Sequence, residues 1–159
     1  MKITHITVVF YSATGNTRKV ITRIAKNIQE ILQVPISYIN YTRPQNRQAS
    51  YSFGKEELVL FASPTYAGRI TNKMIPYIES SFSGTNTPVI PIVVYGNRSF
   101  DNSLSELTDI LSSNRFIPFS AAAIATVHAF SSKIGTNRPD ENDLQQIDSF
   151  CKSASEYIL

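Results

Sequence analysis

The chain of 159 residues contains one cysteine, no tryptophan and no apolar run near the roughly 18 residues that a membrane-spanning helix needs. With Cys151 alone, it can form no intrachain disulfide and no zinc or iron–sulfur site built from several thiolates. Cys151 falls on the apolar face of the last predicted helix, which indicates a buried structural thiol. These shortages exclude intrachain disulfides and metal sites made of several thiolates, and they argue against a membrane-spanning helix.

Charge of either sign is also modest. The chain has 15 Lys and Arg against 12 Asp and Glu, a formal net charge of +3. The basic residues are scattered rather than grouped, which argues against a nucleic-acid-binding surface. The N-terminal stretch MKITHITVVFYS has no small-residue cleavage pattern and is typical of a first strand, so we expect a cytoplasmic protein.

The pattern of apolar residues predicts alternating strands and helices. Near-continuous apolar runs, typical of strands buried on both faces, occur at residues 3–11, 35–41, 57–63, 88–95 and 117–127. Apolar residues at helical spacing lie between them: Val20 to Leu32, Met74 to Phe82, Leu104 to Leu111, and Leu144 to Ile158. Residues 42–56 are polar and fit either a short helix or an irregular crossover. The alternation predicts one domain, a three-layer α/β/α sandwich with a five-stranded parallel sheet.

Ligands of such sheets bind beyond the carboxyl ends of the strands. The first such segment, SATGNT at residues 12–17, combines three hydroxyls, one amide and one glycine at the start of a helix. Unpaired N–H groups and the positive helix end favour an anion there. The segment lacks the G-x-x-x-x-G-K-S/T pattern of nucleoside triphosphate loops, the G-x-G-x-x-G pattern of dinucleotide sites and the thiolate of a cysteine phosphatase. A phosphate cradle is the favoured interpretation, and a simple helix N-cap is the alternative.

Two later loops share another character. SPTYAGR, residues 63–69, offers Tyr66 as a platform for a flat ring beside the Ala67–Gly68 peptide, and YGNRSFDN, residues 95–102, brings Tyr95, a glycine and Asn97. Either loop alone is equally well a surface turn. Because the three loops converge at one edge of the predicted sheet, together they predict a mononucleotide site.

SATGNT resembles the flavodoxin phosphate-loop pattern S/T-x-T-G-N/T-T, and the chain looks flavodoxin-like over its whole length. SPTYAGR, VVYGNRSFDN, the HAFS stretch at 128–131 and the helix start NRPDENDL look most like the flavodoxin domain of EFR1-type (flavodoxin plus ferredoxin) proteins. The resemblance implies strand order 2-1-3-4-5 and non-covalently bound FMN. The phosphate would rest on Ser12, Ala13, Thr14, Gly15, Asn16 and Thr17. The isoalloxazine would lie between Pro64, Thr65, Tyr66, Ala67 and Gly68 on one side and Tyr95, Gly96, Asn97, Arg98, Phe100 and Asp101 on the other.

The same resemblance implies an electron-transfer function. Since the chain has no cysteine-rich module, any iron–sulfur clusters belong to a partner, so we expect a ferredoxin-type protein or a flavin reductase as redox partner. Arg69 and Arg98 are expected beside the ring. A positive charge at about 8 Å would favour the reduced anion by about 1 kcal/mol, roughly +45 mV.

Other functions stay open. One is an FMN-dependent oxidoreductase acting on a quinone or other small substrate, and another is a non-redox binding module with this fold. His128, at the end of the last predicted strand, is either a proton shuttle near the flavin or a hydrogen-bonded loop histidine.

Overall fold

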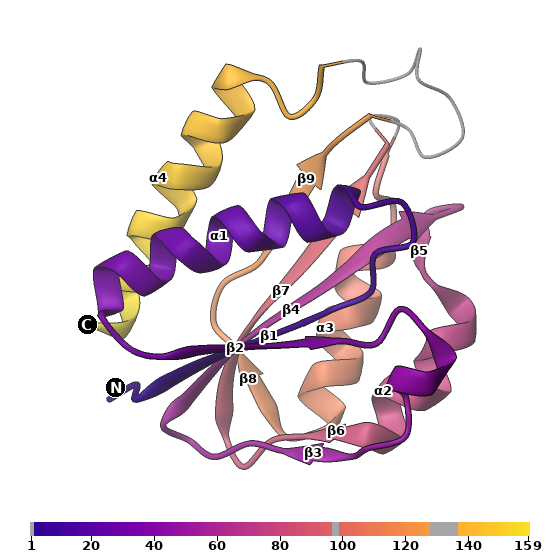
Figure 1. The fold of residues 1–159 in the computed structure, drawn as a ribbon, viewed down its shortest axis with the longest axis vertical. Coiled ribbons are helices and arrows are strands. Elements are labelled where there is room, and N and C mark those ends of the chain that lie inside the picture. Colours follow the sequence, from indigo (N-terminus) through magenta and orange to yellow (C-terminus); the bar gives the residue numbers. More distant parts are fainter. Residues whose placement is uncertain (1, 97–98, 128–136) are drawn as a thin grey trace.

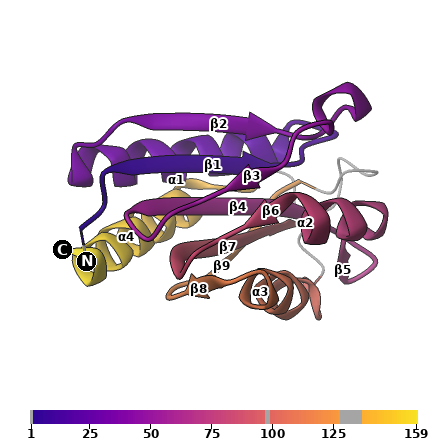
Figure 2. The ribbon, with the colours of Figure 1, turned by 90° about the horizontal axis from the view of Figure 1, so that it is seen from below.

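The computed structural model of the chain describes residues 2–96, 99–127 and 137–159. Parallel strands form the main sheet in the order β2, β1, β4, β7, with β8 and β9 sharing the fifth position beside β7 (Figure 2). The predicted order 2-1-3-4-5 is therefore confirmed. The main strands are β1 (His5–Phe10), β2 (Ile36–Asn40), β4 (Glu57–Tyr66), β7 (Thr87–Tyr95), β8 (Phe116–Pro118) and β9 (Ala122–Ala125).

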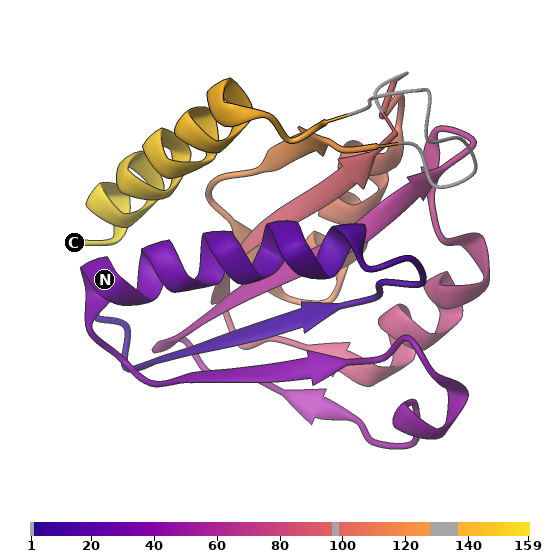
Figure 3. The ribbon, with the colours of Figure 1, turned by 45° about the horizontal axis from the view of Figure 1, so that its top comes forward.

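Helices cover both faces of this sheet, which makes the three predicted layers (Figure 1). The helices α1 and α4 lie together on one face (Figure 3), and α2 and α3 lie on the other. Their bounds are α1 (Asn16–Leu32), α2 (Ile75–Ser81), α3 (Ser103–Ser113) and α4 (Glu141–Ile158). Short elements complete the chain: η1 (Pro44–Asn46), β3 (Tyr51–Ser52), β5 (Arg69–Ile70), η2 (Asn72–Met74) and β6 (Phe82–Ser83).

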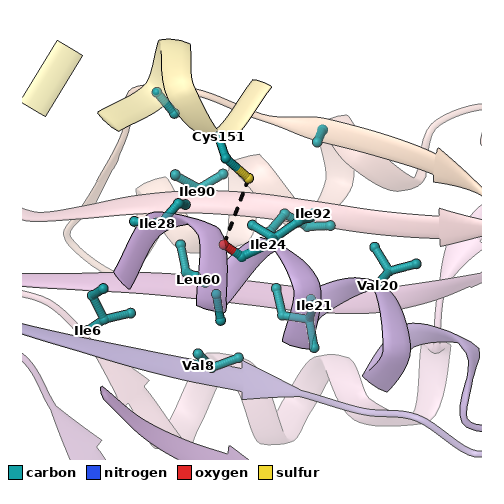
Figure 4. Close-up of a cluster of buried hydrophobic side chains, with 14 of the residues drawn as sticks. Ile6, Val8, Val20, Ile21, Ile24, Ile28, Leu60, Ile90, Ile92 and Cys151 are labelled. Atoms are coloured by element: carbon teal, nitrogen blue, oxygen red, sulfur yellow. Dashed lines mark hydrogen bonds between the residues drawn. The ribbon is translucent and has the colours of Figure 1, made fainter. Parts of the chain in front are cut away.

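The face under α1 and α4 holds an aliphatic core. Alternate residues of β1, β4 and β7 point to it, as the two-residue period of a strand requires. Cys151 of α4 is fully buried there and lies against α1, with its Sγ 3.8 Å from the backbone oxygen of Ile24 (Figure 4). Burial raises the pKa of this thiol to about 12. The structural role predicted for Cys151 agrees with this position.

The opposite face holds an aromatic core. Tyr41, fully buried at the end of β2, lies with its ring centroid 5.6–6.1 Å from those of four neighbours: Tyr11, Phe61, Tyr77 and Phe82. Such tilted ring pairs are favourable beyond their buried area. The Tyr41 hydroxyl has no hydrogen-bond partner among the described residues.

Two strands differ from the sequence prediction. The single strand expected at 117–127 is divided: β8 pairs with β7 at Thr87–Val89, and β9 pairs with it at Ile92–Tyr95. Pro91, which has no N–H to donate, lies between the two ladders. The strand expected at 57–63 instead continues to Tyr66 and turns into β5 as a hairpin.

Smaller differences follow from local packing. Residues 42–56 form one turn of η1 and the short strand β3, with no α-helix between β2 and β4 in this fully described stretch. Ile31, expected on the apolar face of the first helix, is 39% exposed, whereas Ile28 is fully buried and Leu32 packs against the core. Phe82, expected on the second helix, begins β6 and pairs with Tyr51 of β3.

Within the described residues, none of the helices combines the length and apolar character that crossing a bilayer requires. The same residues contain no group of three or more His, Cys, Asp and Glu side chains placed to hold a metal ion.

Candidate functional site

A cavity of about 310 Å³ opens at the carboxyl ends of the central strands, a size within the range of small-molecule sites. Its wall comes from the β1–α1 loop, the β4–β5 hairpin and the ends of β7 and β9. The lining residues are Thr14, Asn16, Thr17, Pro64, Thr65, Tyr66, Ala67, Val94, Tyr95, Gly96, Thr126 and Val127. The three loops singled out in the sequence therefore meet around one space.

The β1–α1 loop presents hydrogen-bond donors to this cavity. Gly15 precedes α1 with φ of +90°, a left-handed conformation that glycine adopts without strain. The hydroxyls of Thr14 and Thr17 line the cavity and bond to no other described residue. The N–H groups of residues 13–15 likewise donate to no other described residue. In the first turn of α1 the same holds for the N–H groups of Asn16 and Thr17, whereas the Arg18 N–H is bonded to the Ser12 hydroxyl. This donor set, at the positive end of a 17-residue helix, suits an anion.

Ser12 and Ala13 have different positions from the residues that follow. The Ser12 hydroxyl accepts a hydrogen bond from the Arg18 N–H at 3.1 Å, so it shapes the loop rather than lining the cavity. Ala13 is exposed and does not line the cavity either.

The end of β2 supports the same loop, although its sequence showed nothing distinctive. The Ser12 N–H donates to the Thr42 hydroxyl at 2.8 Å, and the Thr42 hydroxyl donates to Asn40 Oδ1 at 2.5 Å. On the other side, the Asn16 amide donates to the Val127 carbonyl at 3.1 Å and ties α1 to the end of β9. Sequence reasoning missed Asn40, Thr42 and Val127 because all three act through long-range contacts.

The β4–β5 hairpin forms the second wall. Tyr66 pairs with Arg69, so Ala67 and Gly68 alone make the turn, with φ of +52° and +76°. Positive φ at both central residues is the pattern of a type I′ turn, which demands glycine-like residues. Tyr66 lines the cavity, and burial together with the nearby Tyr11 phenol raises its pKa. The ring predicted as a stacking platform is therefore at the cavity wall.

Contacts with the start of α3 hold this hairpin in place. The Asn102 N–H donates to the Gly68 carbonyl at 3.1 Å. A methyl group on Gly68 would come within 2.6 Å of Asp101 Oδ2, so the two loops are closely packed here. The Ser103 hydroxyl donates its one hydrogen to the Phe100 carbonyl. The Thr65 hydroxyl, 2.8 Å from the Ser103 hydroxyl, is therefore the donor of the hydrogen bond between these two residues. Gly68 and Asp101 thus hold the wall together from behind the cavity.

Arg69 departs from the role expected for it. Its guanidinium forms an ion pair with Glu106 of α3, with Nε 2.9 Å from Oε2, and the Ile70 N–H donates to the other carboxylate oxygen at 3.1 Å. The positive charge that was to act on a ring in the cavity is therefore balanced by an adjacent carboxylate. The predicted contribution of Arg69 to a reduction potential is accordingly reduced.

The β7–α3 loop gives the third wall. Tyr95 and Gly96 line the cavity, while the Phe100 ring lies behind Tyr95 with the ring centroids 5.4 Å apart. Asn97, Arg98 and His128, named from the sequence, lie outside the described residues. Val94 and Thr126 line the cavity without having been predicted, because they lie within segments assigned to strands.

No protein-family model and no characterised protein sequence matches the chain. Solved structures do match it closely in shape. A flavodoxin of Streptococcus pneumonia TIGR4 superposes with a TM-score of 0.66 at 14% identity, covering 96% of this chain and 99% of that one. A short-chain flavodoxin associated with a non-canonical PDU bacterial microcompartment has a TM-score of 0.68 at 12% identity, with 98% and 99% covered.

An enzyme also shares this shape. An NADH:FMN oxidoreductase in its apo form superposes with a TM-score of 0.64 at 12% identity, covering 97% of this chain and 89% of that one. Together with the strand order 2-1-3-4-5, these likenesses show that the chain has a flavodoxin-like fold.

Proposed function

We propose that this chain is an FMN-binding electron-transfer protein. The observation that carries this proposal is that one cavity is lined both by the hydroxyl-bearing residues Thr14 and Thr17 and by Tyr66 and Tyr95. A flavin mononucleotide has the matching chemistry, since it joins a phosphate monoester to a flat aromatic ring.

The residues present fit this cofactor. The phosphate needs donors and no more than a weak counter-charge, and Thr14, Thr17 and the free N–H groups at the start of α1 supply them. The ring needs an aromatic face and backbone polar groups, and Tyr66 and the Ala67 peptide supply these. Val94 and Pro64 add apolar lining.

FMN when bound would supply the redox chemistry. The protein would bind the phosphate, orient the ring against Tyr66 and keep water from one of its faces. We further propose that the chain is related to the flavodoxin domain of EFR1-type proteins. Its electron partner would be a ferredoxin-type iron–sulfur protein or a flavin reductase.

An FMN-dependent oxidoreductase acting on a quinone or another small substrate is the second candidate. The NADH:FMN oxidoreductase among the similar structures favours it. The two candidates separate by assay: turnover of NADH by the isolated, FMN-loaded chain supports the enzyme, whereas turnover only with an added reductase supports the carrier. A non-redox module would show neither FMN uptake nor a flavin spectrum.

The binding test is a fluorescence titration of FMN with the wild-type chain and with a Thr14→Val/Thr17→Val double variant. Two hydrogen bonds to a charged phosphate are lost, so the affinity for FMN should fall about 100-fold. Thr4→Val/Thr85→Val is the matched control, because both residues are exposed and precede strands at the opposite end of the sheet. Its affinity should equal that of the wild type. Unchanged affinity in the first variant, with an intact circular dichroism spectrum, would contradict the assignment of the phosphate loop.

A further inference from the structure

Charge is unevenly distributed at the carboxyl end of the sheet, where the cavity opens. The three segments that follow β1, β2 and β4, residues 12–19, 41–49 and 65–76, contain six Lys and Arg residues and no Asp or Glu. All three lie at the carboxyl end of the sheet, beside one another in Figure 3. This bias is local, because the whole chain holds 15 cationic and 12 acidic residues.

Two of the six cationic side chains have partners inside the fold. Arg69 is paired with Glu106. Arg47 donates to the backbone carbonyls of Tyr41 and Thr42, both at 2.9 Å. Their charge is therefore partly used in holding the loops.

The other four point outward. They are exposed and form no ion pair with any carboxylate of the residues that the structure describes. We name this set the cationic rim: Arg18, Lys19, Arg43 and Lys73.

The acidic residues at this end of the sheet lie on another side. They follow β7 or begin α4: Asp101, Glu106, Asp140, Glu141 and Asp143. Glu106 and Asp143 are ion-paired, and Asp140 caps α4. The region around β1, β2 and β4 is thus positive, whereas the α3 and α4 side carries mixed charge.

A bound phosphate monoester would carry up to about two negative charges at neutral pH. The phosphate would lie at the start of α1, next to Arg18 and Lys19, and its negative charge would offset part of their positive charge. Arg43 and Lys73 follow other strands and keep their charge when the cavity is filled.

We infer that the cationic rim is the docking surface for an acidic electron-transfer protein, a step that rests on the proposed FMN function. A partner must approach the cavity to exchange electrons with a group inside it. Arg18 and Lys19 directly follow the lining residue Thr17, Arg43 follows Thr42, which bonds to Ser12, and Lys73 follows the β4–β5 hairpin. Opposite charge on the partner raises the rate of encounter and orients it. Four cations would neutralise too few phosphates for tight nucleic-acid binding at physiological salt.

The test measures electron transfer from a dithionite-reduced, acidic two-iron ferredoxin to the FMN-loaded chain by stopped flow. One electron leaves the iron–sulfur cluster, which is oxidised, and reduces the flavin. Raising the salt from about 10 to about 200 mM shortens the screening length more than threefold. The second-order rate constant should therefore fall by about tenfold.

Charge reversal localises the effect. Arg43→Glu/Lys73→Glu removes two cations from the rim without touching the residues proposed to hold FMN, and its rate at low salt should fall by about fivefold or more. Lys26→Glu/Lys55→Glu makes the same change of net charge, with one exposed residue in the second half of α1 and the other before β4. This control should stay within about twofold of the wild type.

Several results would overturn the inference. One is a rate constant for the ferredoxin that rises with salt. Another is the same rate for the two double variants. A third is that the reaction of the reduced chain with a basic c-type cytochrome, and not that with the ferredoxin, slows as salt is added. Micromolar binding of a single-stranded oligonucleotide at physiological salt, lost on reversing Arg43 and Lys73, would reassign the rim to nucleic acid. FMN binding with salt-independent rates rejects the docking surface alone, whereas failure to bind FMN rejects the proposed function and the inference together.

Discussion

Gly68 is the residue at which the packing of the cavity wall can be tested most directly. It has φ of +76° in the β4–β5 turn, and an added Cβ would lie 2.6 Å from Asp101 Oδ2 and 2.9 Å from Asp101 Cβ. Gly68→Ala therefore meets two penalties. The left-handed backbone costs an L-residue about 1–2 kcal/mol, and overpacking against Asp101 adds about 1–3 kcal/mol.

We expect the free energy of unfolding of Gly68→Ala to fall by about 3 kcal/mol. For a chain of 159 residues this corresponds to a decrease in Tm of about 6–12 °C. Urea unfolding of the apo-protein, followed by circular dichroism, measures the change independently of any cofactor.

A double-mutant cycle separates the two penalties. Asp101→Gly removes the three atoms that meet the new methyl group, and it suits the φ of +42° at that position. The loss caused by Gly68→Ala should shrink by about 1–3 kcal/mol in that background. Asp101→Asn keeps the shape of the side chain, so the loss of stability caused by Gly68→Ala should be unchanged in that background. A loss below about 0.5 kcal/mol, or additivity in the Asp101→Gly background, would refute the close packing of the two loops.

Further predictions concern the core and α4. Tyr41→Phe should leave the free energy of unfolding unchanged or raise it by up to about 1 kcal/mol, since the buried hydroxyl has no described partner; a clear loss in urea unfolding would contradict this. Asp143 accepts from Arg138 and from the Asp140 N–H, which holds its pKa below the ordinary value, so its stabilisation is present at neutral pH and is lost as the pH falls below about 4. Asp143→Asn should therefore cost about 1–2 kcal/mol at neutral pH, with a smaller difference in acid unfolding experiments. The Cys151 thiol, whose pKa burial raises to about 12, should resist iodoacetamide at mildly alkaline pH until guanidinium unfolds the chain; rapid labelling of the native protein would contradict its burial.

The layers of the fold were predictable from local patterns. The apolar runs at β1, β4 and β7 predict strands that are buried on both faces, and the two cores lie on those faces. The helical spacing in α1 and α4 predicts the helix faces that cover one of these cores. Crossover handedness then leaves few topologies for alternating strands and helices. The tight turn before α1 was also predictable, because small, hydroxyl and glycine residues between a strand and a helix have a local conformational cause. That this loop holds a phosphate stays a prediction.

Long-range contacts decided the remaining features. Nothing in the sequence near Arg69 reveals that Glu106, 37 residues later, balances its charge, or that Thr42 holds Ser12. The division of the last strand depends on how β8 and β9 each pair with β7, and the wall residues Val94 and Thr126 were identified only once the strand ends were placed.

The sequence by itself therefore determined the fold class, the loop suited to a phosphate and the aromatic side chains placed for a ring. The tertiary structure decided which of those residues face one cavity, which ones only support it, and which of the described cations near that end of the sheet form ion pairs. The physical reason is that periodicity and turn chemistry act within a few residues along the chain, whereas charge balance and cavity shape depend on residues brought together by the sheet.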